Sequence, residues 1–242
     1  DNGRFFFTMA KSYEFINLGI WLNKEKILIL SDFHLGYEEY LHQKGVLLPR
    51  FQLEEIIQRL NLIFEKVKPK IIVINGDLKH DFSKNLNQEW KDVLKVLRFI
   101  QNHCQKIILV KGNHDNYLQT IAAKIKIKVV EELIIGNILI LHGDKIKPIP
   151  KSIKTIIIGH EHPAISFREK SKVEKFKSFL RGKWKNKELI VMPSFNPLLE
   201  GTDVLKEKLL SPFLTNILNF EVLAVGEKRI YNFGKVKKLI TK

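Results

Sequence analysis

Five short apolar runs, each followed within a few residues by histidine and in most cases aspartate, constrain the fold of this chain more than any other feature. The run 107–110 leads through Gly112 into Asn113, His114 and Asp115. A continuous apolar run of this length is typical of a strand buried on both faces. Ligand sites in open α/β sheets gather beyond the carboxyl ends of such strands. The three polar residues are therefore placed for chemistry, although alone they are equally compatible with an ordinary polar turn.

The other four runs repeat this arrangement. They are 27–30, 71–74, 138–141 and 153–158, followed by Asp32 and His34, by Asp77 and His80, by His142, and by His160 and His162. Side chains two residues apart in extended backbone point the same way, so the Asp32–His34 spacing suits a divalent metal. Six of the eight histidines lie just past these runs, and core packing does not explain that distribution.

Helical and strand patterns between these runs predict alternating elements. Apolar residues at helical spacing predict helices over 51–67 and 87–103. We further expect a helix over 116–126, strands over 13–22 and 127–130, and a hairpin joining 220–225 to 230–233. This alternation of strands and helices predicts a layered fold.

Residues 166–187 form the most basic segment of the chain. They predict a basic hairpin in which Arg181-Gly182-Lys183 forms a turn. One interpretation is that this hairpin grips a polyanion beside the site. The other is that its lysines protect an exposed sheet edge from aggregation, and the pattern favours this second interpretation slightly.

Composition limits the class of protein. The net charge of +15 favours phosphate-bearing partners, although a lysine-rich proteome would give the same excess. The one cysteine, Cys104, excludes an intrachain disulfide and fits a cytoplasmic protein. No apolar run approaches the roughly 20 residues that a membrane span needs. We expect one domain over 9–242, completed by 166–242, and we interpret residues 1–8 as a remnant preceding a natural start at Met9.

Together, the five blocks resemble those of the calcineurin-like binuclear metallophosphoesterases. The matching blocks are Asp32-Phe33-His34, Gly76-Asp77, Gly112-Asn113-His114-Asp115, His142 and Gly159-His160-Glu161-His162. They occur in the family's order. Within that superfamily the chain is most similar to archaeal phosphoesterases related to the SbcD-type repair nucleases and to bacterial DNA-ligase-associated phosphoesterases, through residues 179–182, 189–197 and 201–203. The resemblance implies an α/β (α+β) fold, a four-layer αββα sandwich of two mixed β-sheets flanked by helices.

The resemblance also implies roles for the site residues. The first metal is held by Asp32, His34 and His162, the second by Asn113, His142 and His160, and Asp77 bridges them. Kinship favours Mn²⁺ for both ions, while iron, zinc, cobalt and nickel suit the same ligands. A bridging hydroxide attacks phosphorus, and His114 protonates the leaving oxygen while Asp115 orients it. His80 helps to position the phosphate, and the neighbouring Lys79 either contacts it or, as we expect, faces solvent.

The leading hypothesis is a metal-dependent phosphodiesterase that acts on nucleotides or nucleic-acid ends, with no membrane partner. A phosphomonoesterase using the same seven ligands is the main alternative. A non-catalytic scaffold is a third, but such a module usually has lost a ligand or the acid, and none is missing here. We expect weak or absent activity on duplex DNA, because the SbcD-like nucleases carry a capping domain and bind an ATPase partner.

Overall fold

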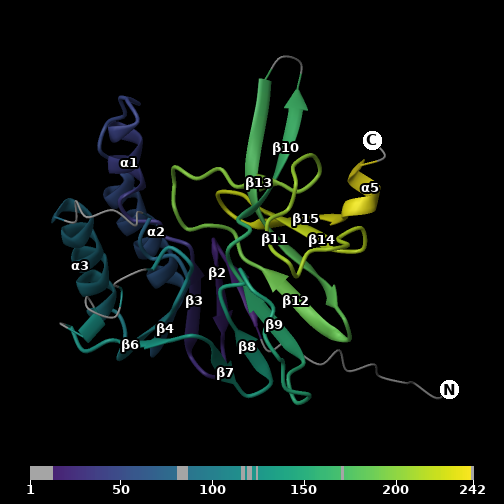
Figure 1. Cartoon of the computed structure of the whole chain (residues 1–242), viewed down its shortest axis with the longest axis horizontal. Helices are drawn as coiled ribbons and strands as arrows, with labels where there is room; N and C mark the ends of the chain where they lie inside the picture. Colours follow the sequence, from purple (N-terminus) through teal and green to yellow (C-terminus); the bar gives the residue numbers. More distant parts are fainter. Residues whose placement is uncertain are drawn as a thin grey trace.

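Two mixed β-sheets packed face to face form the centre of the protein (Figure 1). The computed structural model describes residues 13–80, 87–115, 118, 122–123, 125–169 and 172–240. The first sheet contains, in spatial order, β1 (Glu14–Ile16), β2 (Gly19–Leu22), β3 (Ile27–Ser31), β4 (Ile71–Asn75), β5 (Lys106–Val110) and β6 (Lys128–Val130). Strands β3 to β6 are parallel, so their carboxyl ends lie at one edge.

Helices α1 (Tyr37–Gln43), α2 (Gln52–Lys66) and α3 (Asn87–Gln101) lie on the outer side of this sheet (Figure 1). Neighbouring residues of β3 show how the strand separates two cores. Leu28 and Leu30 pack in the core beneath the helices, whereas Ile27 and Ile29 pack against the second sheet. Side chains alternate between the faces of a strand, so a continuous apolar run is what a strand between two cores requires.

The second sheet supplies the other half of the sandwich. Its main path is β13 (Thr202–Asp203), β10 (Pro163–Glu169), β11 (Lys172–Trp184), β12 (Lys187–Val191), β9 (Thr155–Ile158), β8 (Ile138–Ile140) and β7 (Leu133–Ile135). Strand β14 (Glu221–Val225) pairs with β11 and with β15 (Ile230–Lys235). The outer face is covered by apolar side chains of segment 204–220 and by the short helix α5 (Val236–Ile240).

The structure confirms the two long helices, the buried strands, the C-terminal hairpin and the two-sheet sandwich. Two predictions were wrong, one that residues 13–22 form a single strand and one that residues 181–183 form a turn. Residues 13–22 form two strands, because Asn17 adopts a left-handed backbone with φ of 49° and accepts a hydrogen bond from the Leu18 N–H. Gly182 lies inside β11, where an added Cβ would come within 2.4 Å of the Phe220 ring. That glycine permits close packing, and the turn lies at 185–186. The helix predicted over 116–126 lies largely outside the described residues.

Candidate metal centre

The predicted ligands converge from both sheets at one edge of the sandwich. Asp32, Asp77 and Asn113 follow β3, β4 and β5 of the first sheet. The three histidines His142, His160 and His162 follow β8 and β9 of the second sheet. Parallel β8 and β9 end beside each other, as β3 to β5 do, so strand ends far apart in sequence meet here.

Most of these residues have an unusual backbone conformation. Nine non-glycine residues in the described part of the chain have positive φ, and five of them are predicted ligands. These five are Asp32, His34, Asp77, His160 and His162, with φ between 38° and 65°. Each such conformation costs on the order of 1–3 kcal/mol and persists only where the surroundings impose it. Their concentration at one site indicates that the surrounding fold imposes strained backbone there in order to position these side chains.

The first donor group consists of Asp32, His34 and His162. Nε2 of His34 lies 3.3 Å from Nε2 of His162, which lies 3.5 Å from Oδ1 of Asp32. Asp32 is fully buried, and its Oδ1 has no hydrogen-bond partner among the described residues. Its other oxygen, Oδ2, accepts hydrogen bonds from the Ser31 hydroxyl at 2.6 Å and from the His160 N–H at 3.1 Å. One carboxylate oxygen is therefore held in place while the other faces the histidines.

The second donor group consists of Asp77, His142, His160 and Asn113. Nε2 of His142 lies 2.8 Å from Oδ1 of Asn113, 3.2 Å from Nδ1 of His160 and 3.4 Å from Oδ2 of Asp77. The same Asp77 oxygen lies 3.7 Å from Nε2 of His34 in the first group. A single carboxylate oxygen therefore faces both groups.

These separations fit divalent ions. Donor atoms bound to one ion at about 2.0–2.2 Å in tetrahedral or octahedral geometry lie roughly 2.8–3.6 Å apart. The five neighbouring pairs of nitrogen and oxygen atoms given above are separated by 2.8 to 3.5 Å, and the Asp and His donor atoms of each group all lie within 4.8 Å of one another. Gly112 allows this packing, since a Cβ there would come within 2.0 Å of Oδ1 of Asp77. The residues present could thus hold one ion in each group, with Asp77 between them.

The buried acids and histidines of the two donor groups shift one another's pKa values in different directions. Burial alone would raise the pKa of Asp77, but its hydrogen bond and charge interaction with His142 hold that pKa well below its usual range. Burial alone would lower the pKa of His142, but Asp77 raises it to about 9. Burial and the neighbouring His162 lower the pKa of His34 to about 3. Without metal, one protonated imidazole balances ionised carboxylates, a role that divalent cations fill more completely.

His114 lies beside the first donor group, on the side of His80. Nδ1 of His114 lies 2.8 Å from the carbonyl oxygen of His80, and since a carbonyl only accepts, Nδ1 carries the proton and donates. Nε2 of His114 is then the atom that can exchange a proton with a substrate. His80 itself has Nδ1 3.3 Å from Nδ1 of His34, so it supports the rear of that ring.

Asp115 holds the loop that carries His114. Its carboxylate accepts hydrogen bonds from the Gly112 N–H at 2.9 Å and from the Lys79 N–H at 3.2 Å. Burial, followed by the charge of Asp77, raises the pKa of Asp115 to about 7. The expectation that Lys79 faces solvent was wrong. Lys79 is 1% exposed, and its backbone pairs with that of Leu35 in an isolated bridge.

The sequence indicated a rigid loop over residues 193–197 but not that this loop supports the predicted ligands. The Ser194 hydroxyl donates to the carbonyl oxygen of Asp32 at 2.7 Å, and Nδ2 of Asn196 donates to that of His34 at 3.1 Å. From beneath, Lys177 donates to the carbonyl oxygen of Ser194 at 2.8 Å and also to that of Asn196. The loop therefore holds the strained segment 32–34. Two prolines flanking Ser-Phe-Asn were the available sequence signal for a rigid loop.

Comparison with known proteins now decides the family. The family model of calcineurin-like phosphoesterases matches residues 25–226. The chain belongs to this family. Phosphoester hydrolysis is thereby confirmed as its class of reaction, and the family uses a dinuclear site of divalent metal ions. A comparison with curated proteins finds no match.

Solved structures are also similar to this calcineurin-like phosphoesterase. The Pseudomonas putida nuclease MPE has a TM-score of 0.61 and 18% identity, covering 91% of this chain and all of that one, so it supports the fold. A protein of unknown function, AQ665 from Aquifex aeolicus, has a TM-score of 0.38 and 20% identity, covering 56% of this chain and 78% of that one. A conserved uncharacterised protein from Streptococcus pneumoniae TIGR4, described as a predicted phosphoesterase, has a TM-score of 0.34 and 14% identity. The match covers 86% of this chain and 97% of that one.

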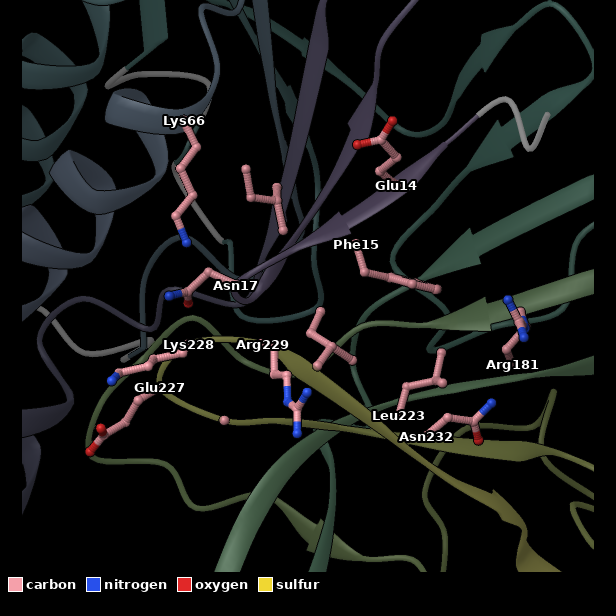
Figure 2. A pocket seen from close by; sticks show the side chains of 13 residues that line it. Glu14, Phe15, Asn17, Lys66, Arg181, Leu223, Glu227, Lys228, Arg229 and Asn232 are labelled. Carbon is pink, nitrogen blue, oxygen red and sulfur yellow. The ribbon is translucent and has the colours of Figure 1, made fainter.

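Two cavities differ in their relation to the metal centre. A cavity of about 690 Å³ lies between the β1–β2 turn and the β14–β15 hairpin, lined by Phe15, Arg181 and Arg229 among others (Figure 2). No predicted site residue lines it. A smaller cavity of about 250 Å³ is lined by Asn113 and His142, and so adjoins the metal centre.

Within the described residues, no helix combines the length and apolar character of a bilayer span.

Proposed function

We propose that the chain is a metal-dependent phosphodiesterase that acts on nucleotides or nucleic-acid ends. The observation that carries this proposal is the meeting of two donor groups at one carboxylate. Oδ2 of Asp77 lies 3.7 Å from Nε2 of His34 and 3.4 Å from Nε2 of His142. We assign the seven ligands accordingly and favour Mn²⁺ for both ions. When bound, two such ions would lower the pKa of a water molecule and stabilise charge on the phosphoryl oxygens.

The remaining residues have roles that follow from their contacts. Hydrolysis adds water to phosphorus and breaks the ester P–O bond, so the departing oxygen needs a proton. His114 in its imidazolium form, with Nδ1–H donating to the His80 carbonyl oxygen, gives its Nε2 proton to the departing oxygen and regains one from solvent before the next turnover. Asp115 keeps the His114 loop in place through backbone hydrogen bonds. His80 contacts Nδ1 of His34 and so supports that ring, and we assign it the further role of helping to position the phosphate.

Two observations support a nucleotide or nucleic-acid substrate. The chain has a net charge of +15, which favours polyanionic partners. The Pseudomonas putida protein that shares the fold is named a nuclease. We place the chain near the SbcD-related and DNA-ligase-associated phosphoesterases on its quoted C-terminal motifs. We propose weak or absent cleavage of duplex DNA.

The test is hydrolysis of bis-p-nitrophenyl phosphate by metal-stripped protein titrated with Mn²⁺. We expect saturable activity that is abolished in Asp77→Asn, because the amide removes the charge that faces both donor groups. Glu25→Gln, at an exposed turn, makes the same change of charge and should retain activity. p-Nitrophenyl phosphate tests the alternative, since strong preference for this monoester would assign a phosphatase. Activity with neither ester under any divalent ion would refute the proposal and favour a scaffold.

A further inference from the structure

Three lysines line the cavity of about 250 Å³ beside the metal centre. Lys111 directly follows β5, and Lys145 and Lys147 lie in the loop after β8, so both sheets contribute. The acidic residues on its wall are Glu131 and Asp144. Nζ of Lys145 lies 3.5 Å from Oδ2 of Asp144. Three cations therefore face two carboxylates, which leaves one positive charge in excess at this cavity.

One carboxylate already lies between two of these lysines. Oε1 of Glu131 lies 3.9 Å from Nζ of Lys111, and Oε2 lies 3.6 Å from Nζ of Lys147. The two ammonium groups thus converge on a single anion. The Glu131 side chain is 66% exposed, and ion pairs between exposed side chains contribute only about 0–1 kcal/mol. A phosphate, with higher charge and more oxygen atoms, can displace this carboxylate at little cost.

The position of the cavity relates it to the reaction. Asn113 and His142 line it and also belong to the second donor group, where Oδ1 and Nε2 lie 2.8 Å apart. A group bound by the lysines is therefore a close neighbour of a phosphoester bound at the metal centre. Neighbouring phosphates joined by one nucleoside are the substrate chemistry that matches this arrangement.

We propose that the pocket formed by Lys111, Lys145 and Lys147 binds a second phosphate of the substrate, next to the phosphodiester that is cleaved. This proposal rests on the proposed function of the metal centre. It names a substrate class within that function, because the enzyme then prefers nucleotide chains carrying an adjacent phosphate to isolated diesters. The lysines supply the attraction, and Glu131 competes with the substrate for two of them.

The test compares thymidylyl-thymidine with the same dinucleotide carrying a 5′-phosphate or a 3′-phosphate. We expect kcat/KM to be about tenfold higher for one phosphorylated form, equivalent to about 1.4 kcal/mol. The ratio of phosphorylated to unphosphorylated substrate should fall towards one in the Lys111→Gln/Lys147→Gln double variant. It should rise in Glu131→Gln, which removes the competing carboxylate. Lys24→Gln, at an exposed turn, is the matched control and should keep the wild-type ratio.

A binding measurement keeps this test separate from the proposed function. By calorimetry, thymidine 3′,5′-bisphosphate should bind more tightly than thymidine 5′-monophosphate, and the double variant should lose the difference. If bis-p-nitrophenyl phosphate is cleaved but an added phosphate changes neither kcat/KM nor binding, the pocket proposal is refuted and the phosphodiesterase stands. A ratio that survives in the double variant also refutes it. Selective binding without cleavage of any ester supports the pocket and refutes the phosphodiesterase.

Discussion

Replacing Ser194 by alanine tests whether the loop 193–197 positions the predicted ligands. The Ser194 side chain is buried, and its hydroxyl donates to the Asp32 carbonyl oxygen at 2.7 Å and accepts from the Asn196 N–H at 3.1 Å. Removing the hydroxyl leaves both backbone groups without that partner. Each buried polar group left unsatisfied costs about 1–3 kcal/mol.

The expected loss of unfolding free energy in Ser194→Ala is therefore at least about 1–3 kcal/mol. For a chain of this size, 1 kcal/mol lowers Tm by about 2–4 °C. Because Asp32 has a strained φ of 54°, weaker support should also let its carboxylate move. We expect Mn²⁺ affinity to fall about 10–100-fold, as is typical when support of a metal ligand is lost.

Thermal melts of metal-free protein and calorimetric titration with Mn²⁺ measure the two effects separately. The matched control is Ser152→Ala, which removes a hydroxyl from an exposed residue and should change neither quantity. A lower Tm with unchanged Mn²⁺ affinity would show that the loop only packs, and would refute the positioning argument. An unchanged Tm would contradict the hydrogen-bond argument itself.

Two further predictions concern protons. In His114→Gln, kcat on thymidylyl-thymidine should fall about 10²–10⁴-fold. The kcat on bis-p-nitrophenyl phosphate should fall much less, because nitrophenolate departs without a proton. Equal losses on the two substrates would contradict a general-acid role for His114. Asp77 outweighs burial and raises the pKa of His142 from 6.5 to about 9. Protonated His142 therefore stabilises the folded state fully below pH 6.5, and this contribution is lost as the pH rises from 6.5 through 9. Urea unfolding of metal-free protein should therefore show up to about 3 kcal/mol of loss as pH rises to 9, and saturating Mn²⁺, which binds neutral imidazole, should remove this dependence.

The predictability of the fold varied with the kind of signal. The helix α2 was predicted within one residue at each end, because an amphipathic helix must place its apolar residues on one face whatever it packs against. The glycine in β11 misled the prediction, since glycine serves both turns and close packing. Only the position of the Phe220 ring over Gly182 distinguishes these uses.

The candidate site shows a similar division. Residue types following buried strands were enough to nominate seven candidate ligands, because parallel strands end at a common edge and bring such residues together. Local sequence carried no indication that Ser194 and Asn196 support Asp32 and His34, which precede them by 162 residues in each pair. Backbone hydrogen bonds of this kind depend on which loops meet, and side-chain type alone does not encode that.

The chain by itself therefore determined most of the buried strands and nominated candidate residues for the chemistry, since these depend on apolar runs and on the side chains that follow them. Tertiary structure decided the left-handed backbone of five predicted ligands, the single Asp77 oxygen shared by two donor groups, and the lysine pocket beside them. The physical reason is distance in sequence. Lys111 and Glu131 become neighbours because β5 and β6 pair in one sheet, and Lys147 reaches Glu131 from the loop after β8 of the other sheet.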